Sequence, residues 1–292
     1  MLETVKYLLG SAGPSGYGSK STAEKVTEQS TDLRSVTAII TGATSGIGAE
    51  TARVLAKRGA KLILPARSIK AAEETKARIL AESPEAEIIV MALDLSSLSS
   101  VRKFVAEFEY LNFPLNLLIN NAGKFAHQHA ISEDGIEMTF ATNHLGHFLL
   151  TKLLLKKLME TANETGVEGR IVNVSSSIHG WFSGDAIQYL RLITKDKSQY
   201  DATRAYALSK LANVLHTKQL ARILKAAATT CYVATHPRLA NVSGKYFADC
   251  NEVSSSKLGS NLTEAERIWS ASEIIVAKSS NANLDPLEAS LL

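Results

Sequence analysis

Five short, mostly apolar runs alternate along the chain with segments of helical periodicity, and this alternation limits the possible folds more than any other feature. The apolar runs are residues 36–40, 61–65, 88–93, 115–119 and 171–174. Hydrophobicity without a polar residue at every second position is typical of parallel strands buried on both faces. The helical periodicity predicts helices over residues 47–58, 68–82, 97–110, 136–160 and 202–225. The chain is therefore predicted to form an α/β domain around a doubly wound parallel sheet.

Composition agrees with one globular domain. Of the 292 residues, 45% are hydrophobic and 21% are charged, which excludes disorder of the whole chain. Lysine and arginine number 32 against 29 acidic residues, a balance that gives no support to nucleic-acid binding. Residues 36–280 are predicted to form the domain. Residues 281–292 are polar, contain a proline, and are predicted to be a flexible tail.

Residues 1–35 are rich in glycine, serine and threonine and are predicted to form a leader rather than a domain. Ser21, followed three positions later by Glu24, is typical of a capping box and predicts a short helix through Glu28. No stretch approaches the roughly 18 apolar residues that a membrane helix needs. The leader begins without a basic flank and contains acidic residues, so neither a secretory signal nor a transit peptide is predicted.

The cysteine content points to a reducing compartment. Only Cys231 and Cys250 occur, which excludes a disulfide scaffold and any metal site built on cysteine spacing. Both are predicted to be free thiols.

A glycine-rich turn follows the first apolar run directly. Glycine permits a tight turn and lets backbone N–H groups approach a pyrophosphate, and the following helix adds the positive end of its dipole. A purely structural turn is the alternative, but a strand before it and a helix after it favour a dinucleotide site. The residues predicted to bind the cofactor here are Gly42, Thr44, Ser45, Gly46, Ile47 and Gly48.

The end of the second apolar run predicts which dinucleotide binds. Sites for NAD usually place an acidic residue there, which hydrogen-bonds the adenosine ribose. This chain instead has Arg67 and Ser68, and a guanidinium suits a 2′-phosphate through charge-assisted hydrogen bonds. We therefore predict NADP(H) rather than NAD(H). A solvated surface arginine is the alternative.

Polar residues also follow the third and fourth runs. Asp94 precedes Leu95, and by itself Asp94 could equally cap the helix that begins after Ser96. The fourth run leads into Asn121-Ala122-Gly123, preceded by a second asparagine. Side-chain amides there can brace the sheet end and contact a ribose, although asparagine and glycine are also common in ordinary turns.

Tyr206 and Lys210 lie four residues apart at the start of the last predicted helix and therefore project from one face. A cation beside a phenol stabilises the phenolate, which lowers the pKa of the tyrosine toward the working pH and suits general acid–base catalysis. The pattern alone is weak, because many helices contain one by chance. Its position after the glycine turn, the asparagine turn and three strand-end serines strengthens it.

This order of motifs resembles the short-chain dehydrogenase/reductase family, whose members have a Rossmann fold and transfer a hydride between nicotinamide and a carbonyl or alcohol carbon. The resemblance implies that Ser176 hydrogen-bonds the reacting oxygen, Tyr206 transfers the proton and Lys210 holds the nicotinamide ribose. It also implies that Asn143 holds a water in the proton relay. Cofactor contacts are implied for Asp94, Leu95, Asn121, Ala122, Gly123, Thr142, Tyr206 and Lys210. The expected substrate is a small apolar carbonyl compound or alcohol.

Residues 140–148 and 206–213 resemble the retinol-dehydrogenase-like branch of this family. Residues 18–24 and 245–250 narrow the resemblance to plant short-chain dehydrogenases associated with the protein translocon of the chloroplast inner envelope. This resemblance implies NADP(H) binding, a peripheral location at that membrane, a redox-regulatory role in preprotein import, and interaction with envelope translocon proteins and calmodulin. Many relatives form homodimers. The segment 265–278 has few basic residues, so the sequence itself gives little support to a calmodulin site.

One departure from the family follows the Tyr-Lys helix. The family places a sixth strand, a Pro-Gly turn and a substrate loop there, whereas residues 220–225 run directly into 226–237, which resemble a later helix of the family. This indicates a deletion of the strand and loop. The alternative is that Pro237 is the turn proline and residues 229–235, rich in β-formers, make a substitute strand, although Arg238 occupies the glycine position.

The deletion has a functional consequence. The missing block normally covers the nicotinamide and one wall of the pocket, so without it the reacting carbon would be open to water and one strand would lose its neighbour. We therefore predict a chain that binds NADP(H) but turns over slowly.

Two further features have competing interpretations. Residues 177–205 form a long insertion that fits a substrate wall, a membrane-facing patch or simple packing against the domain. Its apolar residues are Trp181, Phe182, Tyr189, Leu190 and Leu192.

Four histidines invite a metal-site interpretation, but they lack a matching set of acidic or cysteine ligands, so no metal is predicted. They are His144, His147, His179 and His216.

Overall fold

The computed structural model describes residues 10–29, 32–224, 242–248 and 251–278. Five parallel strands form the central sheet in the order β3-β2-β1-β4-β5. They are β1 (Thr37–Ile40), β2 (Lys61–Ala66), β3 (Ile88–Ala92), β4 (Leu117–Asn120) and β5 (Arg170–Asn173). Each strand begins and ends within about two residues of its predicted apolar run, and the doubly wound α/β fold in one domain is confirmed.

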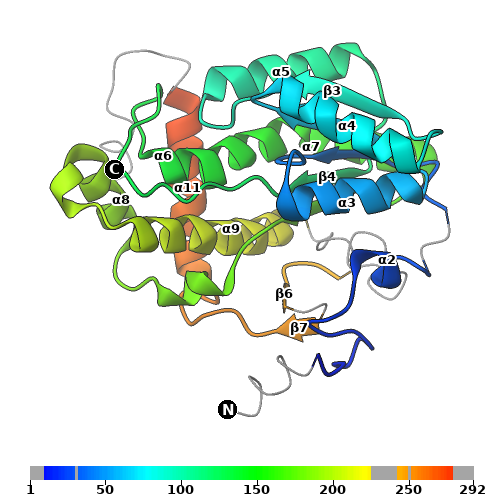
Figure 1. Cartoon of the computed structure of the whole chain (residues 1–292). Helices are drawn as coiled ribbons and strands as arrows, with labels where there is room; N and C mark the ends of the chain where they lie inside the picture. Colours follow the sequence, from blue (N-terminus) through cyan, green and yellow to red (C-terminus); the bar gives the residue numbers. More distant parts are fainter. Residues whose placement is uncertain (1–9, 30–31, 225–241, 249–250, 279–292) are drawn as a thin grey trace.

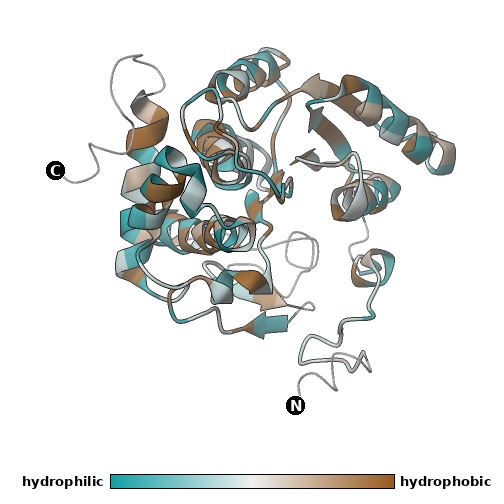
Figure 2. Ribbon diagram, turned by 60° about the vertical axis from the view of Figure 1, so that its left-hand side comes forward, coloured by the Kyte–Doolittle hydropathy of each residue, from teal (hydrophilic) through white to brown (hydrophobic). Residues whose placement is uncertain are grey.

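Both faces of the sheet are buried, which explains the continuous hydrophobicity of the strands. Neighbouring residues of a strand point to opposite faces, so Ala38 and Ile40 of β1 pack into one apolar cluster and Ile39 packs into the other. The first face is covered by α3 (Gly46–Lys57) and α4 (Ile69–Glu82) (Figure 1). The second face is covered by α5 (Leu98–Tyr110), α7 (Gly146–Thr165) and α9 (Ala202–Leu224). Figure 2 shows mostly apolar strands inside helices that carry both apolar and polar residues.

The predicted helix over residues 136–160 is interrupted by a wide turn. It consists of α6 (Met138–Phe140), the π-helical stretch η1 (Ala141–Leu145) and α7. In the π-helical stretch, the carbonyl oxygen of Asn143 accepts hydrogen bonds from two side chains, His147 Nδ1 at 3.1 Å and Asn213 Nδ2 at 3.2 Å. Side chains thus satisfy a backbone group at a point where the regular helical pattern is lost. Such π-helical insertions frequently occur at functional sites.

The leader contains the expected short helix, α2 (Ala23–Val26), but its boundaries differ from the prediction. The residue that caps it is Thr22, whose hydroxyl accepts a hydrogen bond from the backbone N–H of Lys25 at 3.2 Å. Ser21, predicted as the cap, instead accepts a bond from the N–H of Gly18 at 3.0 Å. The helix ends at Val26, before the predicted end at Glu28.

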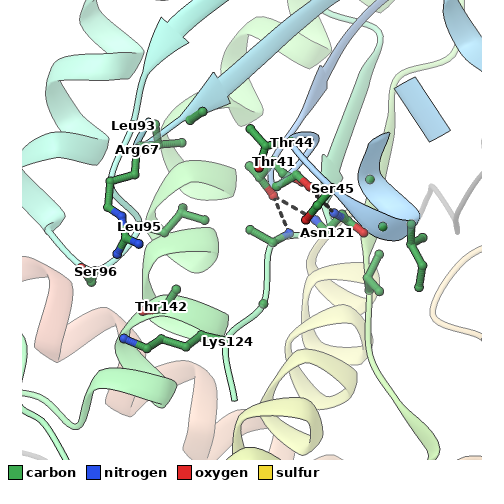
Figure 3. Close-up of a pocket in the computed structure, with 18 of the residues that line it drawn as sticks. Thr41, Thr44, Ser45, Arg67, Leu93, Leu95, Ser96, Asn121, Lys124 and Thr142 are labelled. Atoms are coloured by element: carbon green, nitrogen blue, oxygen red, sulfur yellow. Dashed lines mark hydrogen bonds between the residues drawn. The ribbon is translucent and has the colours of Figure 1, made fainter. Parts of the chain in front are cut away.

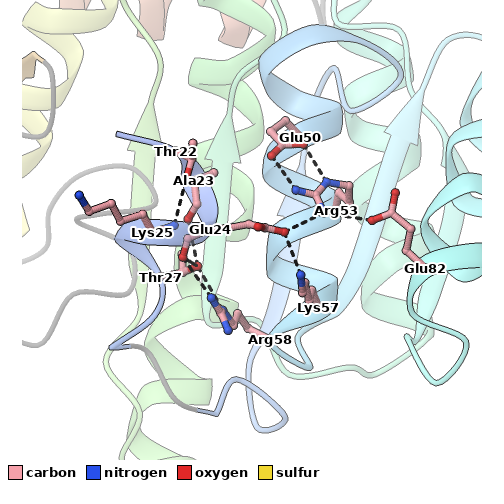
Figure 4. Close-up of polar contacts among 10 residues, drawn as sticks. All are labelled: Thr22, Ala23, Glu24, Lys25, Thr27, Glu50, Arg53, Lys57, Arg58 and Glu82. Carbon is pink, nitrogen blue, oxygen red and sulfur yellow. Dashed lines mark hydrogen bonds and ion pairs between the residues drawn. The ribbon is translucent and has the colours of Figure 1, made fainter. Parts of the chain in front are cut away.

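Contacts at two places attach the leader to the domain. Glu24 of α2 pairs with Arg53 at 3.1 Å and with Lys57 at 2.9 Å, both on α3 (Figure 4). Further along, the side chain of Asn251 accepts from the N–H of Ser15 at 3.0 Å and donates to the carbonyl of Tyr17 at 3.1 Å. The leader therefore joins the helix after the glycine turn to a segment near the C-terminus.

The described C-terminal part holds a small antiparallel pair, β6 (Tyr246–Ala248) and β7 (Asn251–Val253), and the long helix α11 (Leu262–Lys278). Helix α11 packs against α9 (Figure 1). The insertion after β5 forms η2 (Ser177–Trp181), α8 (Ala186–Lys195) and η3 (Lys197–Gln199). Within the described parts of the chain, no helix combines the length and hydrophobicity that crossing a membrane requires.

The outer edge of β5 bears on the predicted deletion. Among the described residues, β5 pairs with β4 and with no other strand. The candidate substitute strand at 229–235 lies outside the described residues, so both interpretations of that segment stay open. The predicted tail at 281–292 also lies outside them, as do Cys231 and Cys250.

Candidate active site

The glycine turn between β1 and α3 is built as a dinucleotide site requires. Gly42 has a φ of +67°, and a Cβ on it would lie 2.7 Å from the Cα of Ala122. A Cβ on Gly48 would lie 2.3 Å from the carbonyl oxygen of Gly42. Side chains are thus excluded at both positions, and the chain makes its sharp turn against the end of β4.

The N-terminus of α3 offers its backbone N–H groups to the open side of this turn. Ser45 caps the helix by position, but its side chain makes no capping hydrogen bond. Helices α4, α5 and α8 differ, because in each a serine or aspartate side chain satisfies an N–H group of the first turn. A Cβ on Gly46 would meet nothing within 4 Å, so the space before the helix is open. The arrangement fits a pyrophosphate bound by backbone N–H groups and the helix dipole.

A cavity of about 850 Å³ extends from this turn across the carboxyl ends of the strands (Figure 3). This position is the usual ligand site of open α/β sheets. Every predicted site residue except Asn143 lines it. They are Gly42, Thr44, Ser45, Gly46, Ile47, Gly48, Arg67, Ser68, Asp94, Leu95, Asn121, Ala122, Gly123, Thr142, Ser176, Tyr206 and Lys210.

Arg67 and Ser68 lie at one end of the cavity, where β2 leads into α4. Arg67 is exposed, and in Figure 3 its guanidinium points into the cavity beside Leu95. The hydroxyl of Ser68 caps α4 by accepting from the N–H of Ala71 at 3.3 Å. Asp94 accepts from the N–H of Ser96 at 2.9 Å and from its hydroxyl at 2.6 Å. Asp94 therefore stabilises its own turn in addition to lining the cavity.

The asparagine turn after β4 is fastened to the glycine turn. The hydroxyl of Thr41 accepts from the N–H of Asn121 at 2.9 Å and from that of Ala122 at 3.0 Å. The side-chain amide of Asn121 donates to the carbonyl of Thr41 at 2.9 Å. The preceding Asn120 is buried and braces the sheet by donating to Thr151 and to Asn173 of β5. The two turns thus form one rigid floor of the cavity.

Tyr206 and Lys210 line the cavity from the first turns of α9. Lys210 is only 3% exposed, and its ammonium lies 5.6 Å from the centre of the Tyr206 ring and donates to the carbonyl of Val174 at 3.1 Å. Burial lowers the pKa of Lys210 to about 8. Burial also raises the pKa of Tyr206 above its ordinary value, whereas we predicted that Lys210 would lower it. The reason is that the ammonium bonds a carbonyl group rather than the phenol.

The serines after β5 have different roles. The hydroxyl of Ser175 donates to the backbone carbonyl of Lys210 at 2.8 Å, so Ser175 holds α9 against the strand end. Ser176 directly precedes η2 and lines the cavity. Its carbonyl accepts from the ring Nδ1 of His179 at 2.7 Å, and the other ring nitrogen accepts from the N–H of Ser256 at 3.0 Å. His179 therefore ties the Ser176 turn to the C-terminal segment.

Asn143 is predicted in the proton relay, but the structure places it behind the cavity wall with no exposed surface. Its side-chain oxygen accepts from the N–H of Lys124 at 2.7 Å, and its side-chain nitrogen donates to the carbonyl of Lys124 at 2.9 Å. The same nitrogen donates to the hydroxyl of Ser209 at 3.0 Å. Asn143 thus holds the loop after β4 to α9.

Among the buried histidines, His147 and His144 have polar partners, whereas His216 packs against aromatic rings. His147 donates from Nδ1 to the carbonyl of Asn143, so its Nε2 accepts the proton of the Thr41 hydroxyl at 2.8 Å. His144 bonds Asn213 at 3.2 Å and Ser272 at 2.9 Å. His216 packs against Phe148 and Trp269 (ring centres 5.2 and 5.5 Å away). In the described part of the chain, no group of three or more potential ligands is placed to hold a metal ion.

The insertion between Ser176 and Tyr206 mainly packs against the domain. Phe182, Tyr189 and Leu190 are at most 5% exposed and belong to the large apolar cluster. Trp181 is 75% exposed and Leu192 is 44% exposed, so only these two of the predicted apolar residues face outward. None of the five lines the main cavity. The cavity therefore gives no support to a substrate wall made by them, and packing describes most of the insertion.

Several lining residues carry no motif signal. Lys124, Phe125 and Met138 reach the cavity from the loop after β4 and from α6. The ring of Phe125 is 40% exposed and lies 5.3 Å from that of Tyr206, which makes one apolar wall beside the phenol. Lys124 and Phe125 directly follow the asparagine turn. Their place next to this turn was the only sequence signal that could have predicted them as site residues.

Comparison with known proteins gives the same assignment. A sequence model of the short chain dehydrogenase family matches residues 36–186, just over half of the chain. The short-chain dehydrogenase TIC 32 A, chloroplastic, of Brassica napus is 46% identical, with 92% of this chain and 97% of the relative covered. Retinol dehydrogenase 12 of Mus musculus is 35% identical, with 80% of this chain and 84% of the relative covered.

The first of these alignments also bears on the length of the chain. It spans 312 positions, whereas 92% of 292 residues is about 269, so about 43 positions have no counterpart in this chain. The relative is therefore longer within the aligned region, as a deletion from this chain predicts. The position of the deletion, after the Tyr-Lys helix, is inferred from the sequence.

A solved structure agrees with the fold over nearly its whole length. The crystal structure of an uncharacterised protein from Mycobacterium paratuberculosis is 30% identical and superposes with a TM-score of 0.66, covering 88% of this chain and 97% of that one. The family match, the relatives and the glycine, asparagine and Tyr-Lys motifs around one cavity all agree. The protein belongs to the short-chain dehydrogenase family and resembles its retinol-dehydrogenase-like branch.

Proposed function

We propose that this protein is an NADP(H)-dependent oxidoreductase that transfers a hydride between nicotinamide and the carbonyl or alcohol carbon of a small apolar substrate. The observation that carries the proposal is that Ser176, Tyr206 and Lys210 line the same cavity as the glycine turn and Arg67. Membership of a family of oxidoreductases supports the reaction class.

The preference for NADP(H) rests on charge. Arg67 is exposed at the end of β2, and the lining residues near it include no acidic residue other than Asp94, which is bonded to Ser96. A 2′-phosphate would gain charge-assisted hydrogen bonds from the guanidinium, whereas a bare 2′-hydroxyl would have no carboxylate of β2 to bond.

The cofactor, when bound, supplies or accepts the hydride, and the chain supplies positioning and the proton. Ser176 hydrogen-bonds the substrate oxygen, and the phenol of Tyr206 gives or takes the proton at that atom. The protonated Lys210 attracts the nicotinamide ribose hydroxyls and, when drawn toward them, favours the phenolate. Phe125 shields one side of the reacting oxygen with an apolar ring.

Slow turnover remains part of the proposal. The outer edge of β5 has no strand partner in the described parts of the chain, and about 43 aligned positions of a relative are missing. A shorter wall on that side would leave the reacting carbon in contact with water, which weakens the electrostatic interactions that favour the transition state.

A second candidate function is NADP(H)-sensing at the chloroplast inner envelope. The 46% identity to a chloroplastic TIC 32 protein favours it. On this proposal the protein is chloroplastic and peripheral to the inner envelope, its partners are envelope translocon proteins and calmodulin, and the occupied cofactor site is the signal. Homodimer formation belongs to the same set of proposals.

Oxidation of NADPH against a panel of aldehydes and ketones separates the two. Measurable turnover that depends on Tyr206 supports the enzyme. Tight NADPH binding without turnover on any substrate, together with NADPH-dependent capture of translocon proteins from envelope membranes, supports the sensor. Absence of both binding and turnover contradicts both proposals.

A further inference from the structure

Two cations line the cavity from different elements. Arg67 comes from the end of β2, and Lys124 comes from the loop after β4. Figure 3 shows both side chains pointing toward the same end of the cavity, where Ser96 lies. In the part of the chain that the structure describes, neither side chain takes part in an ion pair or a hydrogen bond. Two cations without counterions that face one cavity favour an anionic ligand there.

The starting point of the Lys124 side chain is rigidly held. Its N–H donates to the Asn143 side-chain oxygen at 2.7 Å and its carbonyl accepts from the Asn143 side-chain nitrogen at 2.9 Å. Asn143 is fully buried and also bonds Ser209 of α9. A backbone fixed on both sides sets the direction of the side chain, and less conformational entropy is lost when the ammonium binds a ligand.

The opposite charge available in the cavity is small. Among the charged residues that line the cavity in the described part of the chain, Asp94 is the one acid, and its carboxylate already accepts two bonds from Ser96. Some other surface lysines differ from Lys124 because they form ion pairs. Lys57 pairs with Glu24, and Lys152 pairs with Glu273. The ammonium of Lys124 is thus left for a ligand, and it extends away from Thr44 and Ser45 of the pyrophosphate turn (Figure 3).

We infer that Lys124 is a specificity-determining residue that binds the 2′-phosphate of the cofactor together with Arg67. The inference rests on the proposed NADP(H) function and adds a second determinant to it. A planar guanidinium can bond two phosphate oxygens, and an ammonium from the opposite wall can neutralise the remaining charge of a dianion as a point charge. Asn143, which also bonds Ser209, holds the backbone of the loop residue that carries the second cation.

Nucleotide fragments test the inference without any catalysis. Isothermal titration measures the dissociation constants of adenosine 2′,5′-bisphosphate and of 5′-AMP, which differ by the 2′-phosphate. We expect Lys124→Met to weaken binding of the bisphosphate about tenfold, the loss of one exposed charge-assisted hydrogen bond, while binding of 5′-AMP changes less than about twofold. Lys124→Arg should restore most of the bisphosphate affinity, because it keeps the charge.

A neighbouring lysine gives the matched control. Lys70 is exposed on α4, does not line the cavity and lies three positions from Arg67, so Lys70→Met removes the same charge outside the site. It should change neither constant by more than about twofold. An equal effect of Lys70→Met and Lys124→Met on the bisphosphate would overturn the inference, because it would reduce the effect to net charge.

The outcomes separate this inference from the proposal beneath it. If the unaltered protein binds the two fragments equally, the NADP(H) preference itself fails. If the unaltered protein prefers the bisphosphate and Lys124→Met keeps that preference, the role of Lys124 fails while Arg67 retains the site. If Lys124→Met removes the preference and Lys124→Arg restores it, the inference holds.

Discussion

The proton chemistry of the site depends on the surroundings of two side chains. Tyr206 is partly buried, which raises its pKa, and Lys210 is almost fully buried, which lowers its pKa to about 8. The ammonium bonds the carbonyl of Val174 instead of the phenol. Tyr206 is therefore protonated at neutral pH, a state suited to giving a proton to a carbonyl oxygen.

Replacing Tyr206 by phenylalanine removes the proton donor and little else. We expect Tyr206→Phe to lower the rate of NADPH oxidation by about 10²-fold or more, because a positioned acid contributes about that much. Binding of NADPH, measured by fluorescence titration, should change little. Tyr110→Phe, at a tyrosine that is 90% exposed, is the control. An active Tyr206→Phe variant would remove Tyr206 from the catalytic role.

Lys210 gives cofactor binding a pH dependence. The ammonium is present below pH 8 and loses its proton as the pH rises through its pKa of about 8. The attraction between Lys210 and an anionic cofactor therefore also disappears as the pH rises. The dissociation constant for NADPH, measured from pH 6.5 to 9.5, should therefore rise several-fold above about pH 8. Lys210→Met should bind weakly with no such step. A flat profile for the unaltered protein would contradict this role.

The sequence could predict the site residues whose positions are set by their near neighbours in the chain. The residues of the glycine turn and the Tyr-Lys pair line the cavity as predicted, because a turn and one helix face are set by near neighbours. Lys124 escaped prediction because its direction depends on a clamp by Asn143, nineteen positions away. Asn143 itself was predicted to hold a water of the proton relay, and its side chain bonds the backbone of Lys124 and the hydroxyl of Ser209.

Among the helices and strands, α3 links the leader to the cofactor site. Its N-terminus faces the cavity, and on its surface Arg53 bonds Glu50 at 2.8 Å, Glu82 at 3.0 Å and Glu24 of the leader at 3.1 Å (Figure 4). The carboxyl of Glu24 has a lowered pKa because of its bonds to Lys57 and Arg53. Arg53 is thus the cation that holds α2, α3 and α4 together at the surface.

Removing Arg53 should free the leader. We expect Arg53→Met to speed hydrogen–deuterium exchange of residues 18–27 several-fold, and added salt to do the same in the unaltered protein, because exposed ion pairs are screened. Lys156→Met is the control, since Lys156 pairs with Glu160 on the same helix and 3.4 Å away. Unchanged exchange of residues 18–27 in Arg53→Met would show that the contacts of Lys57, Arg58 and Asn251 hold the leader without Arg53.

Elements with a strong local pattern were predictable, and elements fixed by distant contacts were not. The five strands appear as continuous apolar runs because both of their faces are buried. The helix over 136–160 could not be seen to break, since the wide turn at 141–145 depends on side chains from His147 and Asn213. Helix α8 was left unassigned within the insertion, although Asp185 caps it and its apolar side is buried.

For the molecule as a whole, three buried histidines link stability to pH. Burial lowers the pKa of His144 to about 4, that of His147 to about 3, and that of His216 well below its ordinary value. The unfolded chain takes up these protons near pH 6.5, so below that pH it binds more protons than the folded protein does. Stability is therefore complete above about pH 7 and falls as the pH decreases through 6 toward 4.

Urea unfolding at pH 7, 6 and 5 measures this loss. Each unit of pKa shift is worth about 1.4 kcal/mol, so the free energy of unfolding should drop by several kcal/mol over this range. In the described residues, neither ring nitrogen of His216 has a hydrogen-bond partner. His216→Leu should thus keep stability at pH 7 and reduce the loss in acid, whereas exposed His127→Leu should not. Equal stability at pH 7 and pH 5 would contradict the assignment.

The assembly of leader, domain and C-terminal segment is the part that one sequence could not predict. Ser15 and Tyr17 contact Asn251, more than 230 positions away, through hydrogen bonds with no periodicity or motif. Thr22 rather than Ser21 caps α2, because the Ser21 hydroxyl accepts a hydrogen bond from the N–H of Gly18 in the preceding turn. The strands of the central sheet, by contrast, could be predicted from the five continuous apolar runs alone.

The central claim is that the glycine turn, Arg67 and the Tyr206–Lys210 pair form one NADP(H) site. Fluorescence titration of the purified full chain with NADPH and with NADH at neutral pH tests it most directly. The account predicts saturable binding of NADPH at least about tenfold tighter than that of NADH, the gain expected from one charge-assisted phosphate contact. Equal or tighter binding of NADH, or no saturable binding of either nucleotide, would contradict it.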